Sequence, residues 1–132
     1  MFVFAGSLSG VFDASEKTAE NPGFDWLNLK SSITKAFSEK GSRARFENDL
    51  FRLFQEFPAN EIADLPYIYL SCGISDGFLE ASRSFAELLK NKKIKFEYHE
   101  VIGGHEWNYW NRQLADLINI VENKIQSPLI KE

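Results

Sequence analysis

The stretch that decides the fold is Pro66-Tyr-Ile-Tyr-Leu-Ser-Cys-Gly-Ile-Ser-Asp-Gly77. Its first half is a continuous run rich in β-branched and aromatic residues, with Pro66 before it and Gly73 after it. Runs of this kind are typical of strands that are covered on both faces, as central strands of parallel sheets are. The sequence therefore predicts a buried β-strand over residues 66–72.

Two further strands are predicted on either side of this one. The apolar run over residues 2–8 ends at Ser9-Gly10, and the run over residues 94–102 ends at Gly103-Gly104. Both runs have the composition of buried strands and stop at residues that favour turns. We expect about three strands in all.

Helices are predicted between and after the strands. Apolar residues recur at spacings of three and four over residues 45–57, 79–90 and 110–125. That spacing predicts amphipathic helices, the first of which is stopped by Pro58. Strands that alternate with helices need crossover connections, so the predicted fold class is α/β with parallel strands and flanking helices.

The chain is expected to form a single domain over residues 1–132. Within it, residues 14–60 are interpreted as a surface excursion that carries one amphipathic helix, and residues 127–132 as a tail. A length of 132 residues, with 44% hydrophobic and 26% charged residues, suits one packed domain.

Composition excludes several classes of function. With 15 Lys and Arg against 19 Asp and Glu, the net charge of -4 argues against nucleic-acid binding. One Cys and two His cannot supply a structural zinc site, and Cys72 has no partner for an intramolecular disulfide. No apolar run approaches the roughly 18 to 20 residues that span a bilayer. We expect no cofactor, no metal and no membrane partner, and a cytoplasmic location.

Candidate catalytic residues lie in the loops that follow the predicted strands. Loops at the carboxyl ends of parallel strands are where functional groups gather in open sheets. Asp76 follows the second strand and His105 follows the third. They stand in the order of the last two members of a Ser, Asp, His triad. In that arrangement the imidazole is the base, and the carboxylate holds it in one tautomer.

Other interpretations of these residues remain open. Asp76 lies in a Gly-Ile-Ser-Asp-Gly turn and is alternatively a turn former, while His105 is alternatively an ordinary exposed loop residue. His99, inside a predicted strand, is expected to be structural, and Cys72 a small buried hydrophobic residue. Another hypothesis is that Asp76, His105 and Glu106 together carry out general acid-base or metal-assisted hydrolysis. It is weak, because a lone His beside a Glu is a poor metal site.

Two segments together resemble the putative esterase family of α/β-hydrolases. Residues 67–83 contain a Cys-Gly-x-x-Asp turn that looks like the acid loop of the family, and Gly103-Gly-His-Glu-Trp107 looks like its catalytic-His loop. Residues 4–13 are similar to the family strand that follows the helix after the nucleophile. This family includes esterase D, S-formylglutathione hydrolase, and tributyrin, feruloyl and acetyl xylan esterases. The resemblance covers nearly the whole chain, more loosely over residues 14–60, and implies that Asp76 is the triad acid and His105 the triad base.

The nucleophile of the family is the main departure. Its Gly-x-Ser-x-Gly elbow lies upstream of the strand that residues 2–9 resemble, and Gly6-Ser-Leu-Ser-Gly10 does not replace it, because Leu8 is at the centre. We expect a truncated α/β-hydrolase domain, the carboxyl-terminal half, without nucleophile or oxyanion hole. The isolated chain should have little esterase activity. The alternative is a non-catalytic half-fold that self-associates or complements a separate amino-terminal half.

Self-association is expected in either case. A first strand near the edge of an incomplete sheet exposes unpaired backbone groups and apolar faces, which mark interfaces. The chain has 12 Phe, many of them in its first 57 residues, so a dimer or larger oligomer is expected to bury this side. If this chain is part of a complete esterase, the substrate of that enzyme should be an uncharged or weakly charged carboxylic ester. Trp107 is then a candidate pocket residue.

Overall fold

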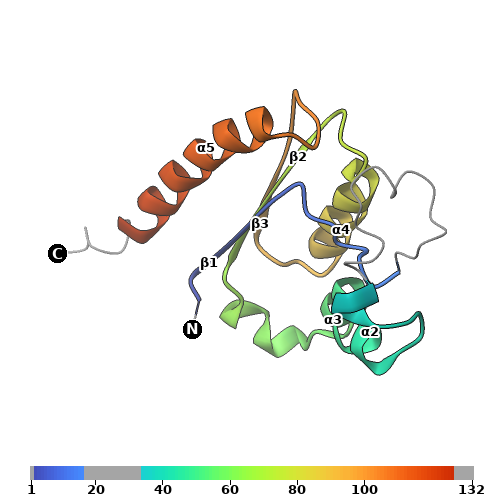
Figure 1. Cartoon of the computed structure of the whole chain (residues 1–132). Coiled ribbons are helices and arrows are strands. Elements are labelled where there is room, and N and C mark those ends of the chain that lie inside the picture. Colours follow the sequence, from blue (N-terminus) through green and yellow to red (C-terminus); the bar gives the residue numbers. More distant parts are fainter. Residues whose placement is uncertain (1, 17–33, 127–132) are drawn as a thin grey trace.

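The structure is a computed structural model, and it describes residues 2–16 and 34–126, with side chains to residue 123 (Figure 1). The predicted tail at 127–132 and part of the predicted excursion at 14–60 lie outside the described residues. The elements are β1 (Phe4–Leu8), α2 (Arg43–Glu47), α3 (Leu50–Glu56), the 3-10 helix η2 (Ala59–Asp64), β2 (Tyr67–Gly73), α4 (Leu79–Asn91), β3 (Phe96–Val101) and α5 (Trp107–Gln126).

The three strands form one parallel sheet in the order β1-β2-β3. Ser7 is in register with Leu70, and Leu70 with Tyr98. Helix α5 lies against β1 and β2 on one side of the sheet, and α4 lies against β2 and β3 on the other (Figure 1). The predicted α/β class with three parallel strands is confirmed, and β2 is buried from Ile68 to Gly73 as predicted.

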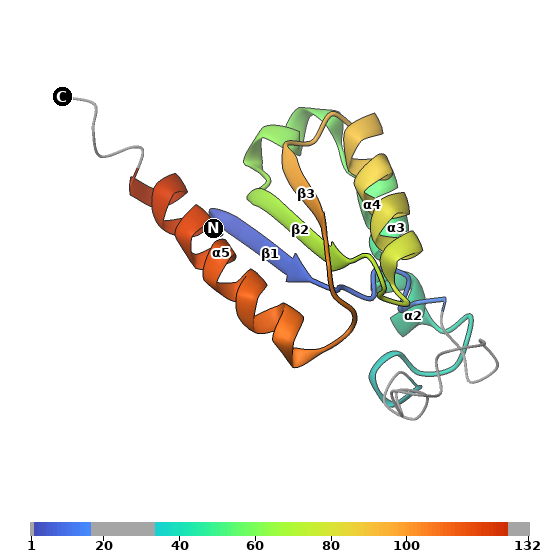
Figure 2. The same ribbon diagram turned by 90° about the horizontal axis from the view of Figure 1, so that it is seen from above.

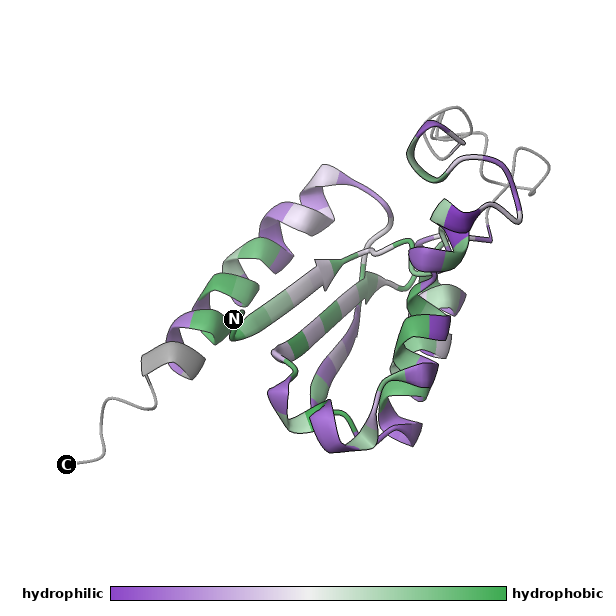
Figure 3. Ribbon diagram, turned by 90° about the horizontal axis from the view of Figure 1, so that it is seen from below, coloured by the Kyte–Doolittle hydropathy of each residue, from purple (hydrophilic) through white to green (hydrophobic). Residues whose placement is uncertain are grey.

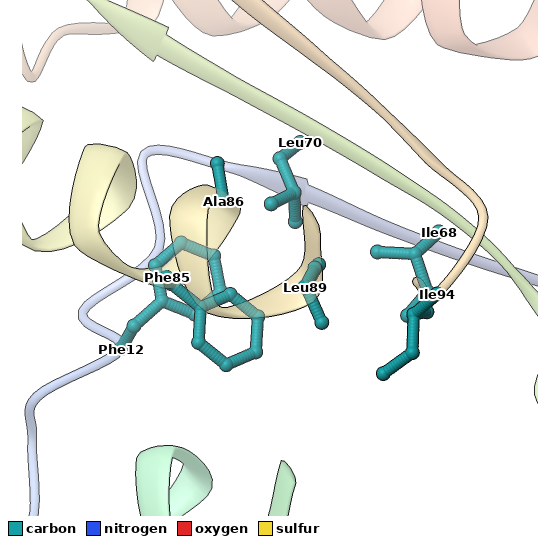
Figure 4. Packing of buried hydrophobic residues seen from close by; sticks show 7 residues of the cluster. All are labelled: Phe12, Ile68, Leu70, Phe85, Ala86, Leu89 and Ile94. Atoms are coloured by element: carbon teal, nitrogen blue, oxygen red, sulfur yellow. The ribbon is translucent and has the colours of Figure 1, made fainter. Parts of the chain in front are cut away.

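The main core lies between the sheet and helices α3 and α4. Its buried members are shown in Figure 4: Phe12, Ile68, Leu70, Phe85, Ala86, Leu89 and Ile94. The rings of Phe12 and Phe85 stack with centroids 4.5 Å apart, an arrangement that adds to the free energy of burial. Because Ile68 and Leu70 alternate with Tyr69 and Ser71 along β2, the first pair faces this core and the second pair faces α5.

The predicted single helix over residues 45–57 is wrong. The segment forms two short helices that are separated at Asn48-Asp49. The Asp49 side chain accepts a hydrogen bond from the Arg52 N–H (3.2 Å) and caps α3, while Asn48 Nδ2 donates to the Ala44 carbonyl (2.8 Å) at the end of α2. Short polar side chains of this type compete with helix hydrogen bonding, and two in succession end one helix and begin another.

Other element boundaries differ by a few residues. The last helix begins at Trp107 instead of 110, because the Tyr109 and Trp110 N–H groups both donate to the Glu106 carbonyl (3.1 Å each). The predicted helix 79–90 is confirmed as α4, and the strands at 2–8 and 94–102 as β1 and β3 with shorter bounds.

Some of the described phenylalanines of the amino-terminal half are in the core and others are exposed. Phe51 and Phe54 pack edge-on against Phe85, so they serve the chain's own core. Phe2 and Phe46 are 85% and 59% exposed. Phe51 and Phe54 are therefore not part of an open surface, whereas Phe2 and Phe46 are exposed. The oligomer expected to bury this side stays a prediction.

Candidate active site

The loops after β2 and β3 are locked together at the carboxyl edge of the sheet. The Ser75 N–H donates to the Gly103 carbonyl (3.0 Å), and the Ile74 N–H donates to the Val101 carbonyl (2.9 Å). The two backbones approach so closely that a Cβ added at Gly73 would lie 2.4 Å from Gly103 O. Gly103 itself has φ +149°, which favours glycine. This packing folds the loop after β3 back over the end of β2.

The locked loops bring the two predicted catalytic residues together. His105 Nδ1 lies 3.1 Å from Asp76 Oδ2, and the two side chains are 14% and 0% exposed. The other carboxylate oxygen, Oδ1, accepts the Phe78 N–H (2.9 Å). A carboxylate with both oxygens engaged has a fixed direction, and its Oδ2 is placed to accept a hydrogen bond from the Nδ1–H of the imidazole.

Aromatic side chains hold the imidazole on two sides. The Phe78 ring meets His105 edge-on at 5.0 Å between centroids, and the Trp110 ring meets it at 4.8 Å and 89°. Trp107 contacts Trp110 in the same manner at 5.1 Å and is 73% exposed. Trp107, the predicted pocket residue, therefore lies one ring away from His105 and is exposed; its role as a pocket residue stays a prediction.

A buried polar network anchors the start of α5 beneath this site. Ser71 Oγ and the Tyr109 hydroxyl lie 2.7 Å apart, and Ser71 Oγ donates to Gln113 Oε1 (2.9 Å). Tyr109 is fully buried, and burial raises the pKa of its hydroxyl to about 12. Sequence reasoning missed this network; its one visible signal was a serine within an otherwise apolar strand. Because β2 and α5 are tied here, the His105 loop between β3 and α5 is held from both ends.

Ser75 is a further serine to compare with a nucleophile elbow, besides Ser9 of the Gly6–Gly10 segment that the sequence already argued against. Residues 73–77, Gly-Ile-Ser-Asp-Gly, spell Gly-x-Ser-x-Gly, which sequence reasoning passed over, and Ser75 is exposed between β2 and α4. The φ of Ser75 is not positive. Ser9 does have a positive φ, +59°, but its side chain is buried and the residue is only 4% exposed. A nucleophile elbow needs a strained serine on a sharp turn with an exposed Oγ. Neither serine combines the two properties.

Cys72 and His99, which the sequence predicts to be structural residues, pack against other parts of the chain. Cys72 is fully buried as predicted, and burial raises the pKa of its thiol. The His99 ring stacks on the Tyr69 ring with centroids 5.3 Å apart, and His99 Nε2 lies 3.3 Å from Glu97 Oε2. In the part of the chain that the structure describes, no group of three or more His, Cys, Asp or Glu residues could hold a metal ion. Over the same residues, no helix is long and apolar enough to cross a membrane.

The family follows from a comparison with known families. A family model described as "Putative esterase" matches residues 1–119. The chain belongs to this esterase family. An acetyl esterase of Caldicellulosiruptor saccharolyticus is 30% identical to the chain over 95 residues, which are 70% of this chain and 35% of the relative.

Solved structures of similar proteins show the same α/β-hydrolase fold. A ferulic acid esterase has a TM-score of 0.66 at 23% identity, over 92% of this chain and 42% of that one. The S-formylglutathione hydrolase FrmB of Staphylococcus aureus has a TM-score of 0.57 at 17% identity, over 89% of this chain and 40% of that one. The esterase-family chain described here thus spans less than half the length of each of these relatives.

Proposed function

We propose that this chain supplies the acid and the base of a serine carboxylesterase. The observation that carries the proposal is the 3.1 Å contact between His105 Nδ1 and the buried Asp76 carboxylate. Membership of the esterase family supports it. In this reaction the serine Oγ bonds to the ester carbonyl carbon, and His105 Nε2 takes the proton that the serine hydroxyl loses. The proton then passes to the leaving alkoxide as the ester C–O bond breaks.

The second half of the reaction uses the same pair. A water gives its proton to Nε2 as its oxygen attacks the acyl-serine, and the proton returns to serine Oγ when the acid is released. The Asp76 carboxylate accepts the hydrogen bond from Nδ1–H and stabilises the imidazolium in both halves. The Phe78 N–H bond keeps the carboxylate aimed at Nδ1 throughout.

We further propose that the serine and the oxyanion-hole donors come from polypeptide outside these 132 residues. Ser9 is buried and Ser75 lacks the strained backbone of an elbow, so neither is a suitable nucleophile. Donors aimed at a developing oxyanion are among the largest contributions to acyl transfer. Alone, the chain is therefore expected to turn over esters barely faster than solution. A cytoplasmic location, consistent with the free Cys72, is part of the proposal.

The substrate of the completed site is proposed to be an uncharged or weakly charged carboxylic ester. The exposed ring of Trp107 beside Trp110 and His105 is a flat apolar surface that suits an acyl or aryl group. Relatives named as acetyl esterase and ferulic acid esterase support small acyl and aryl esters as the first compounds to test.

The test is hydrolysis of 4-nitrophenyl acetate by the purified chain, with His105→Ala and Ser75→Ala as matched variants. We expect the chain and both variants to have the same low rate. Robust turnover that His105→Ala abolishes would contradict the proposal that the chain alone is inactive. If Ser75→Ala abolished it too, Ser75 would be the nucleophile after all.

The second candidate is a non-catalytic half-fold that self-associates. The exposed Phe2 and Val3 before β1, 85% and 64% accessible, favour it. A dimer or larger oligomer by light scattering at micromolar concentration is the expected result for this candidate. A monodisperse monomer would count against it.

A further inference from the structure

A cleft of about 630 Å³ lies at the amino end of the sheet, between η2 and the turn that joins α4 to β3. Its lining comes from residues 59–67 and 92–95. Figure 1 shows η2, in green, at the foot of the sheet and the loops after β2 and β3 at its head, and Figure 2 shows η2 beside the turn between α4 and β3. Because Asp76 and His105 lie in the loops at the head, the cleft is separate from the candidate active site. Small-molecule sites have volumes of roughly 300–1,000 Å³, so the cleft has a suitable size.

The floor of the cleft is aliphatic. Ile94 is a buried member of the main core, and Ile62 and Leu65 pack against that core from the side of η2. Ala63 and Pro66 also line the cleft. In Figure 3 η2 carries hydrophobic and hydrophilic residues together, so it can give apolar side chains to the floor and still face solvent. A ligand that fills the cleft therefore needs an apolar body.

The charged groups in the lining are all positive. Lys92, Lys93 and Lys95 line the cleft, and no Asp or Glu is among the described residues that do so. Glu61 and Asp64 of η2 are exposed and lie outside the lining. The whole chain is acidic, with a net charge of -4, so three lysines within four positions are a local exception. A concave site with charges of one sign attracts a ligand of the opposite sign.

One of the three lysines holds the cleft together and the other two have free ammonium groups. Lys92 Nζ donates to the Gln55 carbonyl (2.8 Å) and to the Phe57 carbonyl (3.0 Å), which ties the end of α3 to the turn after α4. Lys93 and Lys95 are exposed, and among the residues that the structure describes no hydrogen bond or ion pair engages either side chain. Their two charges are therefore available to an anionic ligand.

Lys93 occupies a backbone position that glycine usually takes. The Ile94 N–H donates to the Leu89 carbonyl and the Lys93 N–H to the Lys90 carbonyl, each at 3.0 Å, which is the Schellman pattern at the end of a helix. The residue with positive φ in this motif is usually glycine, but here Lys93 has φ +57°. A lysine costs stability at this position. Strain of this kind concentrates at functional sites, which supports a binding role for Lys93.

We propose that this cleft binds a monocarboxylate with an aliphatic chain, with the chain on the floor of Ile62 and Leu65 and the carboxylate between Lys93 and Lys95. A phosphate dianion fits less well, because the cleft lies at the carboxyl end of α4, where the partial negative charge of the helix opposes a second negative charge. Phosphate sites are more often built from helix N-termini or arginine. Ester hydrolysis releases carboxylic acids, so only the interpretation of the ligand as a reaction product rests on the proposed function.

The test is a titration of the ¹⁵N-labelled chain with sodium hexanoate, followed through the amide chemical shifts. Hexanamide is the uncharged counterpart of the ligand, and hexyl phosphate is the counterpart with a phosphate group. Lys95→Gln and Lys93→Gly each remove one charge from the cleft, and Lys90→Gln is the matched control, because Lys90 is exposed on α4 outside the lining. Lys93→Gly also removes the strain at φ +57°, so weaker binding by this variant is not a result of unfolding.

A second pair of variants tests the side of η2. Ala63→Glu places a carboxylate in the cleft, and Asn60→Glu places one on the same short helix outside the lining. Both positions are exposed, so neither substitution disturbs the core. Ala63→Glu should weaken hexanoate binding because it adds a like charge beside the ligand, whereas Asn60→Glu should have little effect.

We expect saturable shifts at the amides of residues 59–67 and 92–95. Lys95→Gln and Lys93→Gly should each raise the dissociation constant about threefold, as for a partly exposed ion pair, and hexanamide, which loses both pairs, should bind about tenfold more weakly. Absence of saturable shifts at these amides, or shifts confined to Trp107 and Trp110, would overturn the proposal. Equal binding of hexanamide would reduce the site to apolar adsorption, and tighter binding of hexyl phosphate would replace it with a phosphate site.

Two controls separate this proposal from the others. A homodimer that Ala63→Glu dissociates would show that a second copy covers the cleft, and it would overturn the proposal. None of these measurements needs turnover, and His105→Ala should leave hexanoate binding unchanged. A failure here therefore leaves the proposed roles of Asp76 and His105 intact, and a failure of those roles leaves the binding result intact.

Discussion

Replacing Gly73 by alanine should disrupt the loops that hold the candidate site. The new Cβ would lie 2.4 Å from Gly103 O and 2.7 Å from Gly103 C, both backbone atoms that cannot rotate away. Ordinary carbon–oxygen contacts are about 3.3 Å or more, so the loop after β3 must move by roughly 0.9 Å. That shift stretches the 3.0 Å bond from the Ser75 N–H to the Gly103 carbonyl beyond useful length.

The cost combines two effects. Overpacking of a tight contact costs about 1–3 kcal/mol, and loss of one hydrogen bond adds about 1 kcal/mol, so we expect Gly73→Ala to lose about 2–4 kcal/mol. Gly77→Ala is the matched control, because a Cβ there would meet nothing within 4 Å. Urea unfolding followed by tryptophan fluorescence measures both. If Gly73→Ala unfolded at the same urea concentration as the original chain, the close approach of the two loops would be refuted.

Two further substitutions and one modification test other parts of the structure. Lys93→Gly should stabilise the chain by about 0.5–1 kcal/mol in thermal unfolding, because Lys93 is exposed at φ +57°, where a side chain is strained; a loss of stability would contradict this. Tyr109→Phe should cost about 1 kcal/mol in urea unfolding through loss of the bond to Ser71, and an unchanged midpoint would argue against the buried network. Cys72 should react with iodoacetamide only after denaturation, since it is fully buried and its pKa is raised; rapid labelling at pH 8 would show that the site opens.

The sheet could be predicted because its signals are local. The run from Tyr67 to Cys72 has apolar or aromatic side chains on both faces apart from Ser71, and its alternation with helical segments leaves few topologies besides a parallel sheet. Asp76 and His105 could be paired for the same reason, since loops after adjacent parallel strands share one edge. The distance between the two side chains could not be predicted from their separation in the sequence. The 3.1 Å contact between His105 Nδ1 and Asp76 Oδ2 depends on how the loop after β3 folds back over Gly73.

The features that were missed depend on local competition or on long-range packing. The break at Asn48-Asp49 results from side chains that cap two helices within an unbroken amphipathic pattern. The bond between Ser71 and Tyr109 joins residues 38 positions apart, and only the final placement of α5 decides it. Phe12 belongs to the core through its stacking on Phe85, a contact between residues far apart in the sequence that no local pattern indicates.

We propose that Asp76 holds His105 ready to act as a base. Long-range ¹⁵N–¹H NMR of the imidazole in the intact chain tests it most directly, because it reports which ring nitrogen carries the proton. With Nδ1 3.1 Å from the carboxylate, neutral His105 should be in the Nδ1–H tautomer, and Asp76→Ala should return it to a mixture dominated by Nε2–H. An Nε2–H tautomer in the original chain, unchanged by Asp76→Ala, would show that Asp76 does not orient His105.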